Sequence, residues 1–160
     1  MHAGHLKLAS DAMSELNLDR IYFVPSYKTP LKNNAQMMPW AGRVERLRKT
    51  LKKYPGFSVC LCEIRRKGAS YTVDTLKFFK KKFGKKSALY FLSGADTLRN
   101  FRRWKAPAEI MKLSRFVVFS RPGFGLMKQA LPEGALYVPM DALAISSTQI
   151  RSKNKIERSS

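Results

Sequence analysis

The chain has 160 residues, 44% of them hydrophobic, and its 31 lysines and arginines outnumber its 11 acids to give a formal net charge of +20. This length suits one compact α/β or α+β domain, so we expect residues 1–160 to form a single domain. We expect neither a membrane-spanning nor a secreted protein, because no apolar run reaches about 20 residues and the first residues lack the order of a signal peptide. We therefore expect a soluble, cytoplasmic protein.

Helices and strands are expected to alternate along the chain. In chain order they are a helix over residues 6–16, a strand over 21–24, a helix over 41–53, a strand over 57–64, a helix within 67–83, a strand over 87–93, a helical region over 99–113 interrupted near Pro107, and a strand over 115–121. This alternation favours a mostly parallel sheet with helices on both faces. Ligands are then expected where the carboxyl ends of the strands meet.

Two of the helices carry apolar stripes at helical spacing, which predict core packing. The first stripe is Val44, Leu47 and Leu51, and the second is Val73, Leu76, Phe79 and Phe83. The only cysteines, Cys60 and Cys62, fall two apart in the expected strand 57–64. On a strand this spacing points both thiols to one face, where a disulfide between them has poor geometry, so two buried reduced thiols are favoured over a metal site.

Both histidines of the chain, His2 and His5, lie three apart in HAGH at the start of the first helix. Residues at this spacing share one face of a helix, and a helix N-terminus favours anions such as a polyphosphate. An ordinary surface pair is an open alternative. A zinc site is a weaker one, since no third ligand lies close by in the sequence.

Three further loops carry groups that suit a phosphate or a nucleotide. Lys32 ends the segment VPSYKTPLK, which two prolines stiffen. In SYTVDT, the Thr72 hydroxyl is expected to cap the following helix, with Asp74 in its first turn. In SGADTL, Gly94 lets the backbone approach a ligand, and Asp96 is either a ligand-binding group or a helix cap.

The segment ISSTQIR predicts a last anion site. Ser146 and Gln149 have the spacing of a capping box, while Ser147, Thr148 and Arg151 can reach an anion at that helix N-terminus. A capped but otherwise inert helix is the alternative. The large positive charge attracts polyanions of any kind, so nucleic acid, anionic membrane and nucleotide substrates stay open as partners, although no nucleic-acid-binding signature is recognisable.

In order and spacing, HAGH, VPSYKTPLK, SYTVDTL, SGADTL, the tryptophan of FRRW, FSRPGF and ISSTQIR resemble the bacterial nicotinate mononucleotide adenylyltransferases of the nucleotidylyltransferase superfamily. The resemblance covers almost the whole chain. It implies a Rossmann-like α/β fold with a parallel sheet. It also implies a reaction in which ATP and nicotinate mononucleotide give deamido-NAD and pyrophosphate, with Mg²⁺ bound through the ATP phosphates.

The resemblance also implies roles for individual residues. Those implied to bind ATP are His2, His5, Gly94, Ser147, Thr148 and Arg151. Those implied to neutralise or hold phosphate during the reaction are His2, His5, Lys32 and Arg151. Thr72, Asp96 and Trp104 are implied to bind the pyridine nucleotide, with the indole stacked on the nicotinate ring and Asp96 near the ribose.

The chain departs from the family pattern in three places. Leu31 stands where the family usually has a histidine, the chain ends nine residues after Arg151, and the first strand with its G-G-x-F-D-P segment does not precede HAGH. We expect Met1 to be an internal methionine, with an apolar strand and a glycine-rich turn encoded upstream. That strand would lie in the middle of the sheet, so its neighbours would each show an unpaired edge.

Two alternatives to the leading interpretation are carried forward. One is adenylyl transfer to another acceptor, such as nicotinamide mononucleotide or phosphopantetheine. The other is a basic, catalytically inactive relative that binds nucleotide or nucleic acid.

Overall fold

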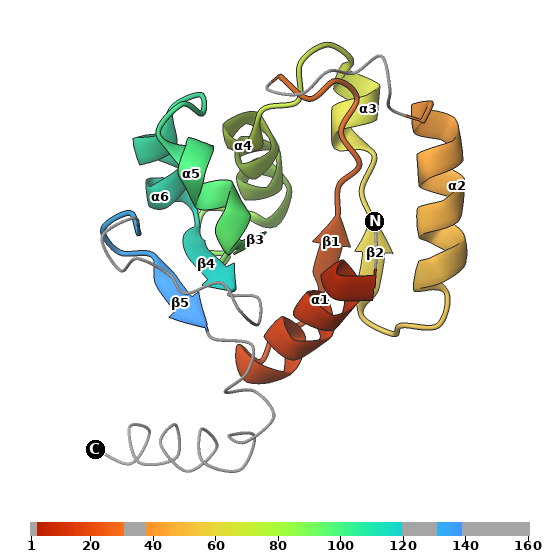
Figure 1. Ribbon diagram of the computed structural model, residues 1–160, viewed down its shortest axis with the longest axis horizontal. Coiled ribbons are helices and arrows are strands. Elements are labelled where there is room, and N and C mark those ends of the chain that lie inside the picture. Colours follow the sequence, from red (N-terminus) through yellow and green to blue (C-terminus); the bar gives the residue numbers. More distant parts are fainter. Residues whose placement is uncertain (1–2, 31–37, 120–130, 139–160) are drawn as a thin grey trace. The chain divides into compact units, whose positions relative to one another are not determined.

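The computed structural model describes residues 3–30, 38–119 and 131–138 (Figure 1). The described chain forms helices and five short strands, and every strand pairing in it is parallel. It divides into two compact units that alternate along the sequence. The first unit contains residues 19–89 and 103–114, and the second contains the remaining described residues.

A two-stranded parallel sheet and four helices make up the first unit. Its strands are β1 (Ile21–Phe23) and β2 (Phe57–Val59), paired with Ile21 beside Phe57. Its helices are α2 (Trp40–Leu51), α3 (Cys62–Arg66), α4 (Thr72–Phe83) and α6 (Pro107–Leu113). The predicted stripe on α2 is confirmed, since Val44, Leu47 and Leu51 are all buried.

The second predicted stripe, on α4, is only partly confirmed. Val73, Leu76 and Phe79 are buried, but Phe83 at the last position is 43% exposed. The helix ends there because Gly84 follows with a φ of 86°, a conformation that favours glycine. Phe83 instead packs at the rim of the core, with its ring 5.8 Å from Phe79 and 5.7 Å from Tyr22.

The second unit contains a three-stranded parallel sheet of order β3-β4-β5. Its elements are α1 (Ala3–Glu15), β3 (Tyr90–Gly94), the 3₁₀ turn η2 (Ala95–Thr97), α5 (Leu98–Phe101), β4 (Arg115–Phe119) and β5 (Leu136–Val138). The central strand β4 has no exposure at residues 116–119, as the sequence predicted. Phe116 anchors this core, with ring centroids 5.2 Å from Phe91 and 4.8 Å from Phe101.

The predicted strand over 57–64 is wrong beyond Val59. The backbone turns at Leu61, whose carbonyl accepts a hydrogen bond from the Arg65 N–H, and residues 62–66 form the short helix α3. The two cysteines therefore do not share a strand face. Both are free thiols as expected, with Cys62 buried and Cys60 half-buried. Burial raises the pKa of the Cys62 thiol to about 12, with a further contribution from neighbouring Cys60.

Four strands have one edge without a strand partner among the described residues, and β1 and β3 are two of them. β1 pairs only with β2, and β3 pairs only with β4. The sequence analysis did not predict β5, whose three residues are too short to stand out as a strand pattern. Within the described part of the chain, no helix is long and apolar enough to cross a bilayer.

Candidate active site

The predicted site residues fall into three groups by position. Thr72 and Trp104 belong to the first unit, and His5, Gly94 and Asp96 belong to the second. Five others lie outside the described residues: His2, Lys32, Ser147, Thr148 and Arg151.

His5 lies in the first turn of α1 and is exposed. No acidic residue of α1 occupies that turn, so no carboxylate of the helix itself offsets the positive end of its dipole. Further along α1, Lys7 Nζ lies 2.8 Å from Asp11 Oδ2. The N-terminal turn of α1 is therefore an electropositive surface carrying an imidazole, which suits phosphate oxygens.

Gly94 and Asp96 lie in contact at the carboxyl end of β3. A Cβ atom placed on Gly94 would stand only 2.6 Å from Asp96 Oδ1, so the carboxylate folds back over the glycine. Gly94 has φ −80° and ψ 157°, and it precedes η2 without any side-chain cap. Asp96 is exposed inside η2, so its alternative interpretation as a helix cap is wrong. The absent side chain of Gly94 thus makes room for the Asp96 carboxylate.

Thr72 is the first residue of α4, and its predicted capping role is wrong. The helix begins one residue earlier than expected, so Tyr71 takes the N-cap position, and no side chain caps the helix. Ser70, which precedes Tyr71, does not cap the helix either. Its hydroxyl accepts a hydrogen bond of 2.8 Å from the Tyr27 N–H. Asp74 lies in the first turn of α4, as predicted. The Thr72 hydroxyl is therefore not used as a cap.

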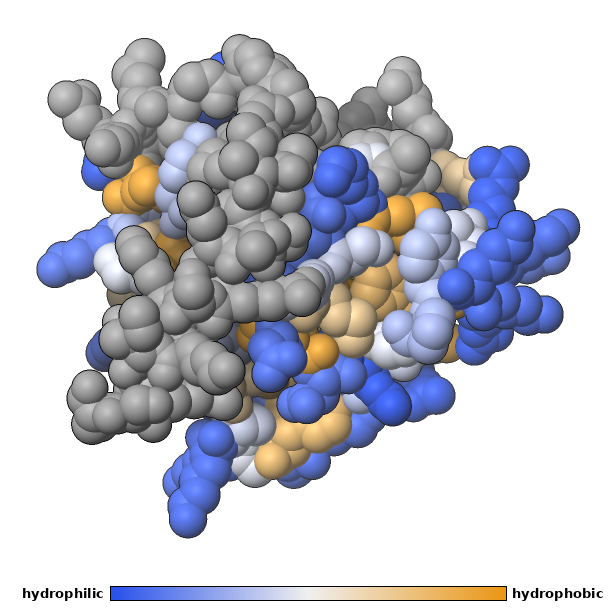
Figure 2. Space-filling view, turned by 90° about the horizontal axis from the view of Figure 1, so that it is seen from below, coloured by the Kyte–Doolittle hydropathy of each residue, from blue (hydrophilic) through white to orange (hydrophobic). Residues whose placement is uncertain are grey.

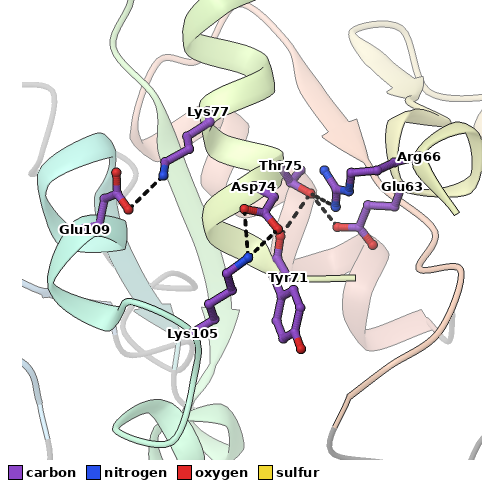
Figure 3. Close-up of polar contacts among 8 residues, drawn as sticks. All are labelled: Glu63, Arg66, Tyr71, Asp74, Thr75, Lys77, Lys105 and Glu109. Atoms are coloured by element: carbon purple, nitrogen blue, oxygen red, sulfur yellow. Dashed lines mark hydrogen bonds and ion pairs between the residues drawn. The ribbon is translucent and has the colours of Figure 1, made fainter. Parts of the chain in front are cut away.

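A lysine that the sequence analysis missed ties the Trp104 segment to the start of α4 (Figure 3). Lys105 Nζ lies 3.1 Å from Asp74 Oδ2, and it also lies over the Tyr71 ring, 4.6 Å from the centroid. Trp104, the half-buried neighbour of Lys105, is thereby held in the same unit as Thr72. The Asp74–Lys105 pair spans 31 residues, and no local pattern signals it.

A second ion pair supports the same arrangement. Lys77 Nζ of α4 lies 3.0 Å from Glu109 Oε2 of α6, so both ends of the 105–109 segment are bonded to α4 (Figure 3). Both pairs are partly exposed, so each contributes little to stability on its own, about 0–1 kcal/mol. Their joint effect is to restrict where this segment lies on α4.

Buried polar contacts fix α3 against α4 (Figure 3). The Thr75 hydroxyl donates a 2.6 Å hydrogen bond to Glu63 Oε1, and Arg66 Nη2 donates a longer one of 3.5 Å to Thr75 Oγ1. Glu63 and Thr75 are only 8% and 7% exposed. A buried carboxylate needs such a donor, so this contact determines how α3 packs on α4.

The acidic groups of the described residues do not form a metal cage. No cluster of three or more potential ligands occurs among them, which also leaves the zinc alternative without support there. The carboxylate of Asp74 is already bonded to Lys105, while Asp96 is exposed at a strand end. Mg²⁺ typically binds through one or two carboxylates together with substrate phosphates and waters. The donor set fits a magnesium ion carried by nucleotide phosphates.

Comparisons with known proteins identify the family of the chain. Residues 1–153 match the Cytidylyltransferase-like family. A probable nicotinate-nucleotide adenylyltransferase of Clostridium botulinum is 36% identical over 97% of this chain and 80% of its own length. One from Aquifex aeolicus is 41% identical over 77% of this chain and 72% of its own. The chain therefore belongs to the cytidylyltransferase-like family, within the group of the nicotinate-nucleotide adenylyltransferases.

A solved structure shows the same fold. Plasmodium falciparum nicotinic acid mononucleotide adenylyltransferase, complexed with NaAD, superposes with a TM-score of 0.65. The match covers 96% of this chain and 82% of that one at 18% identity. Because the sequence identity is low, this structural similarity establishes the fold alone. The expected nucleotidylyltransferase-type α/β fold is thereby confirmed.

Proposed function

We propose that this protein transfers the adenylyl group of ATP to nicotinate mononucleotide, giving deamido-NAD and pyrophosphate in NAD biosynthesis. The observation that carries the proposal is the 36% identity to a probable nicotinate-nucleotide adenylyltransferase over 97% of the chain. We treat both compact units as parts of one domain over residues 1–160, since the family match spans residues 1–153. The reaction belongs in the cytoplasm, where ATP is available.

The reaction needs no protein nucleophile. A phosphate oxygen of nicotinate mononucleotide attacks the α-phosphorus of ATP, and the bond to the bridging oxygen breaks as pyrophosphate leaves. The protein positions the two phosphates and offsets their charge. His5 at the N-terminus of α1 does this for ATP, and we assign the same task to His2, Lys32 and Arg151. Mg²⁺ bound through the ATP phosphates supplies further charge neutralisation.

The pyridine nucleotide is recognised by Thr72, Asp96 and Trp104 in this proposal. The N-terminus of α4 has no side-chain cap. The Thr72 hydroxyl and the adjacent N–H groups of the first turn are therefore donors for the nicotinate carboxylate. The Trp104 indole offers a planar face for the ring. Asp96 is an acceptor for ribose hydroxyls. Gly94, Ser147 and Thr148 complete the ATP side.

The test is a pyrophosphate-release assay with purified protein, ATP, nicotinate mononucleotide and Mg²⁺. His5→Ala should lower kcat by about 100-fold, the loss typical of one preorganised electrostatic donor. Lys7→Ala, an exposed cation two residues further along α1, is the matched control and should retain activity. Full activity of His5→Ala, or an equal loss in both variants, would remove the phosphate role of His5.

A further inference from the structure

Two hollows on the first unit lie next to each other. The first, of about 270 Å³, is lined by residues that follow β2 and by side chains of α4, among them Tyr22, Phe78 and Lys82. The second, of about 550 Å³, follows α2 from Trp40 to Lys52. Arg48 and Leu61 line both hollows, so they adjoin. We call the two adjoining hollows together the α2–α4 groove.

The lining of the α2–α4 groove is strongly positive. Among the described residues that line it, Glu45 is the one carboxylate, against five cations: Arg48, Lys49, Lys52, Arg65 and Lys82. None of the five is among the ion pairs that the described residues form with acids. Cys62 adds no negative charge to the lining at neutral pH, because burial raises its pKa to about 12. Cations that converge on a hollow from three helices repel one another and attract an anionic ligand.

Aromatic rings are exposed in both halves of the groove. Trp40 in the α2 hollow is 43% exposed, and Phe78 in the other hollow is 38% exposed. Lys82 Nζ already lies 5.5 Å from the centroid of the Tyr22 ring, so cations and ring faces alternate here. On the face that Figure 2 draws, hydrophobic surface lies between projecting hydrophilic side chains.

We propose that the α2–α4 groove binds single-stranded nucleic acid. The cations would contact backbone phosphates, while Trp40 and Phe78 would stack on bases, the combination by which single strands are bound without sequence preference. A duplex hides its base faces, so it cannot use the rings. A concave surface also fits a strand better than it fits a flat bilayer. This binding is additional to adenylyl transfer, since no groove residue has a role in that reaction.

The experiment measures binding of the full chain to a fluorescein-labelled oligouridine of about 12 nucleotides by anisotropy over a range of salt concentrations. The groove variant is the double substitution Arg65→Gln with Lys82→Gln. Its matched control, Lys85→Gln with Lys86→Gln, removes the same charge from exposed positions that do not line the groove. Trp40→Leu tests stacking separately. Circular dichroism melting and the adenylyl-transfer assay check that every variant is folded and active.

The groove variant should bind at least about tenfold more weakly, and its log–log salt slope should fall by about 1.4, or 0.7 for each lost phosphate contact. Trp40→Leu should lose about fivefold or more through stacking. The control variant should bind like the original chain. Equal weakening of both double variants would overturn the proposal, because binding would then follow net charge alone. Equally tight binding of a duplex, of polyglutamate, or of phosphatidylserine vesicles in place of oligouridine would also overturn it.

Discussion

Replacing Gly94 by alanine tests whether Asp96 recognises a substrate. The backbone at Gly94, with φ −80° and ψ 157°, is an extended conformation that alanine adopts without strain. The added Cβ would stand 2.6 Å from Asp96 Oδ1, closer than such atoms pack, so the carboxylate has to move. The substitution therefore displaces one side chain and leaves the main chain in place.

The expected loss follows from the contact that the carboxylate would leave. A hydrogen bond to a charged group contributes about 1.5–3 kcal/mol, and each 1.4 kcal/mol is a factor of ten in rate. Gly94→Ala should thus lower kcat/KM by about 10- to 100-fold. The free energy of unfolding should change by no more than about 1 kcal/mol from that of the original chain, since Asp96 is exposed and alanine restricts the unfolded chain more than glycine does.

A double-mutant cycle separates this mechanism from a general disturbance of the strand end. The pyrophosphate-release assay is run on Gly94→Ala, Asp96→Ala and the double variant. If alanine at position 94 acts only by displacing Asp96, it costs nothing further once the carboxylate is gone, whereas a loss that persists without Asp96 would come from the ATP contact assigned to Gly94. Wild-type kcat/KM in Gly94→Ala, or the same fold loss with and without Asp96, would refute the reasoning.

Three further predictions follow from the first unit. Thr75→Val should lower the free energy of unfolding by about 1–3 kcal/mol in urea denaturation, because buried Glu63 loses its hydrogen-bond donor. Thr75→Ser keeps the hydroxyl and should retain most of that free energy. Equal losses in the two variants would contradict this role of the hydroxyl. Lys105→Met should raise KM for the mononucleotide several-fold with little change in kcat or stability, because the Lys105–Asp74 ion pair is exposed and only positions the Trp104 segment. Lys105→Arg should restore KM. An unchanged KM in Lys105→Met would remove the positioning role of Lys105. The Cys62 thiol has its pKa raised from 9.0 to about 12, so the unfolded chain loses this proton first and stability should fall between those pH values. Cys62→Ala should show a smaller fall, and parallel curves for the two proteins would contradict this assignment.

Elements with a strong local pattern were predictable from the sequence. The helix α2 was predicted because Val44, Leu47 and Leu51 repeat at helical spacing, and all three are buried. The strand β4 was predicted because it is a continuous apolar run, as a strand buried on both faces requires.

The errors occur where distant contacts override local preference. Residues 60–64 look like the continuation of a strand, yet residues 62–66 form a helix in which buried Glu63 accepts a hydrogen bond from Thr75, twelve residues further on. The ion pair that ties the Trp104 segment to α4 joins Lys105 to a residue 31 positions away. Sequence spacing carries no information on such pairs, so the supporting contacts of the candidate site became visible only in the structure.

The central claim is that this chain makes deamido-NAD, and the most direct test is a paired kinetic measurement with two acceptors. Purified protein is assayed with ATP, Mg²⁺ and either nicotinate or nicotinamide mononucleotide, and the dinucleotide product is identified by chromatography. We predict Mg²⁺-dependent formation of deamido-NAD, with a higher kcat/KM for nicotinate mononucleotide. An equal or reversed preference, or no dinucleotide from either acceptor by the folded protein, would contradict the account.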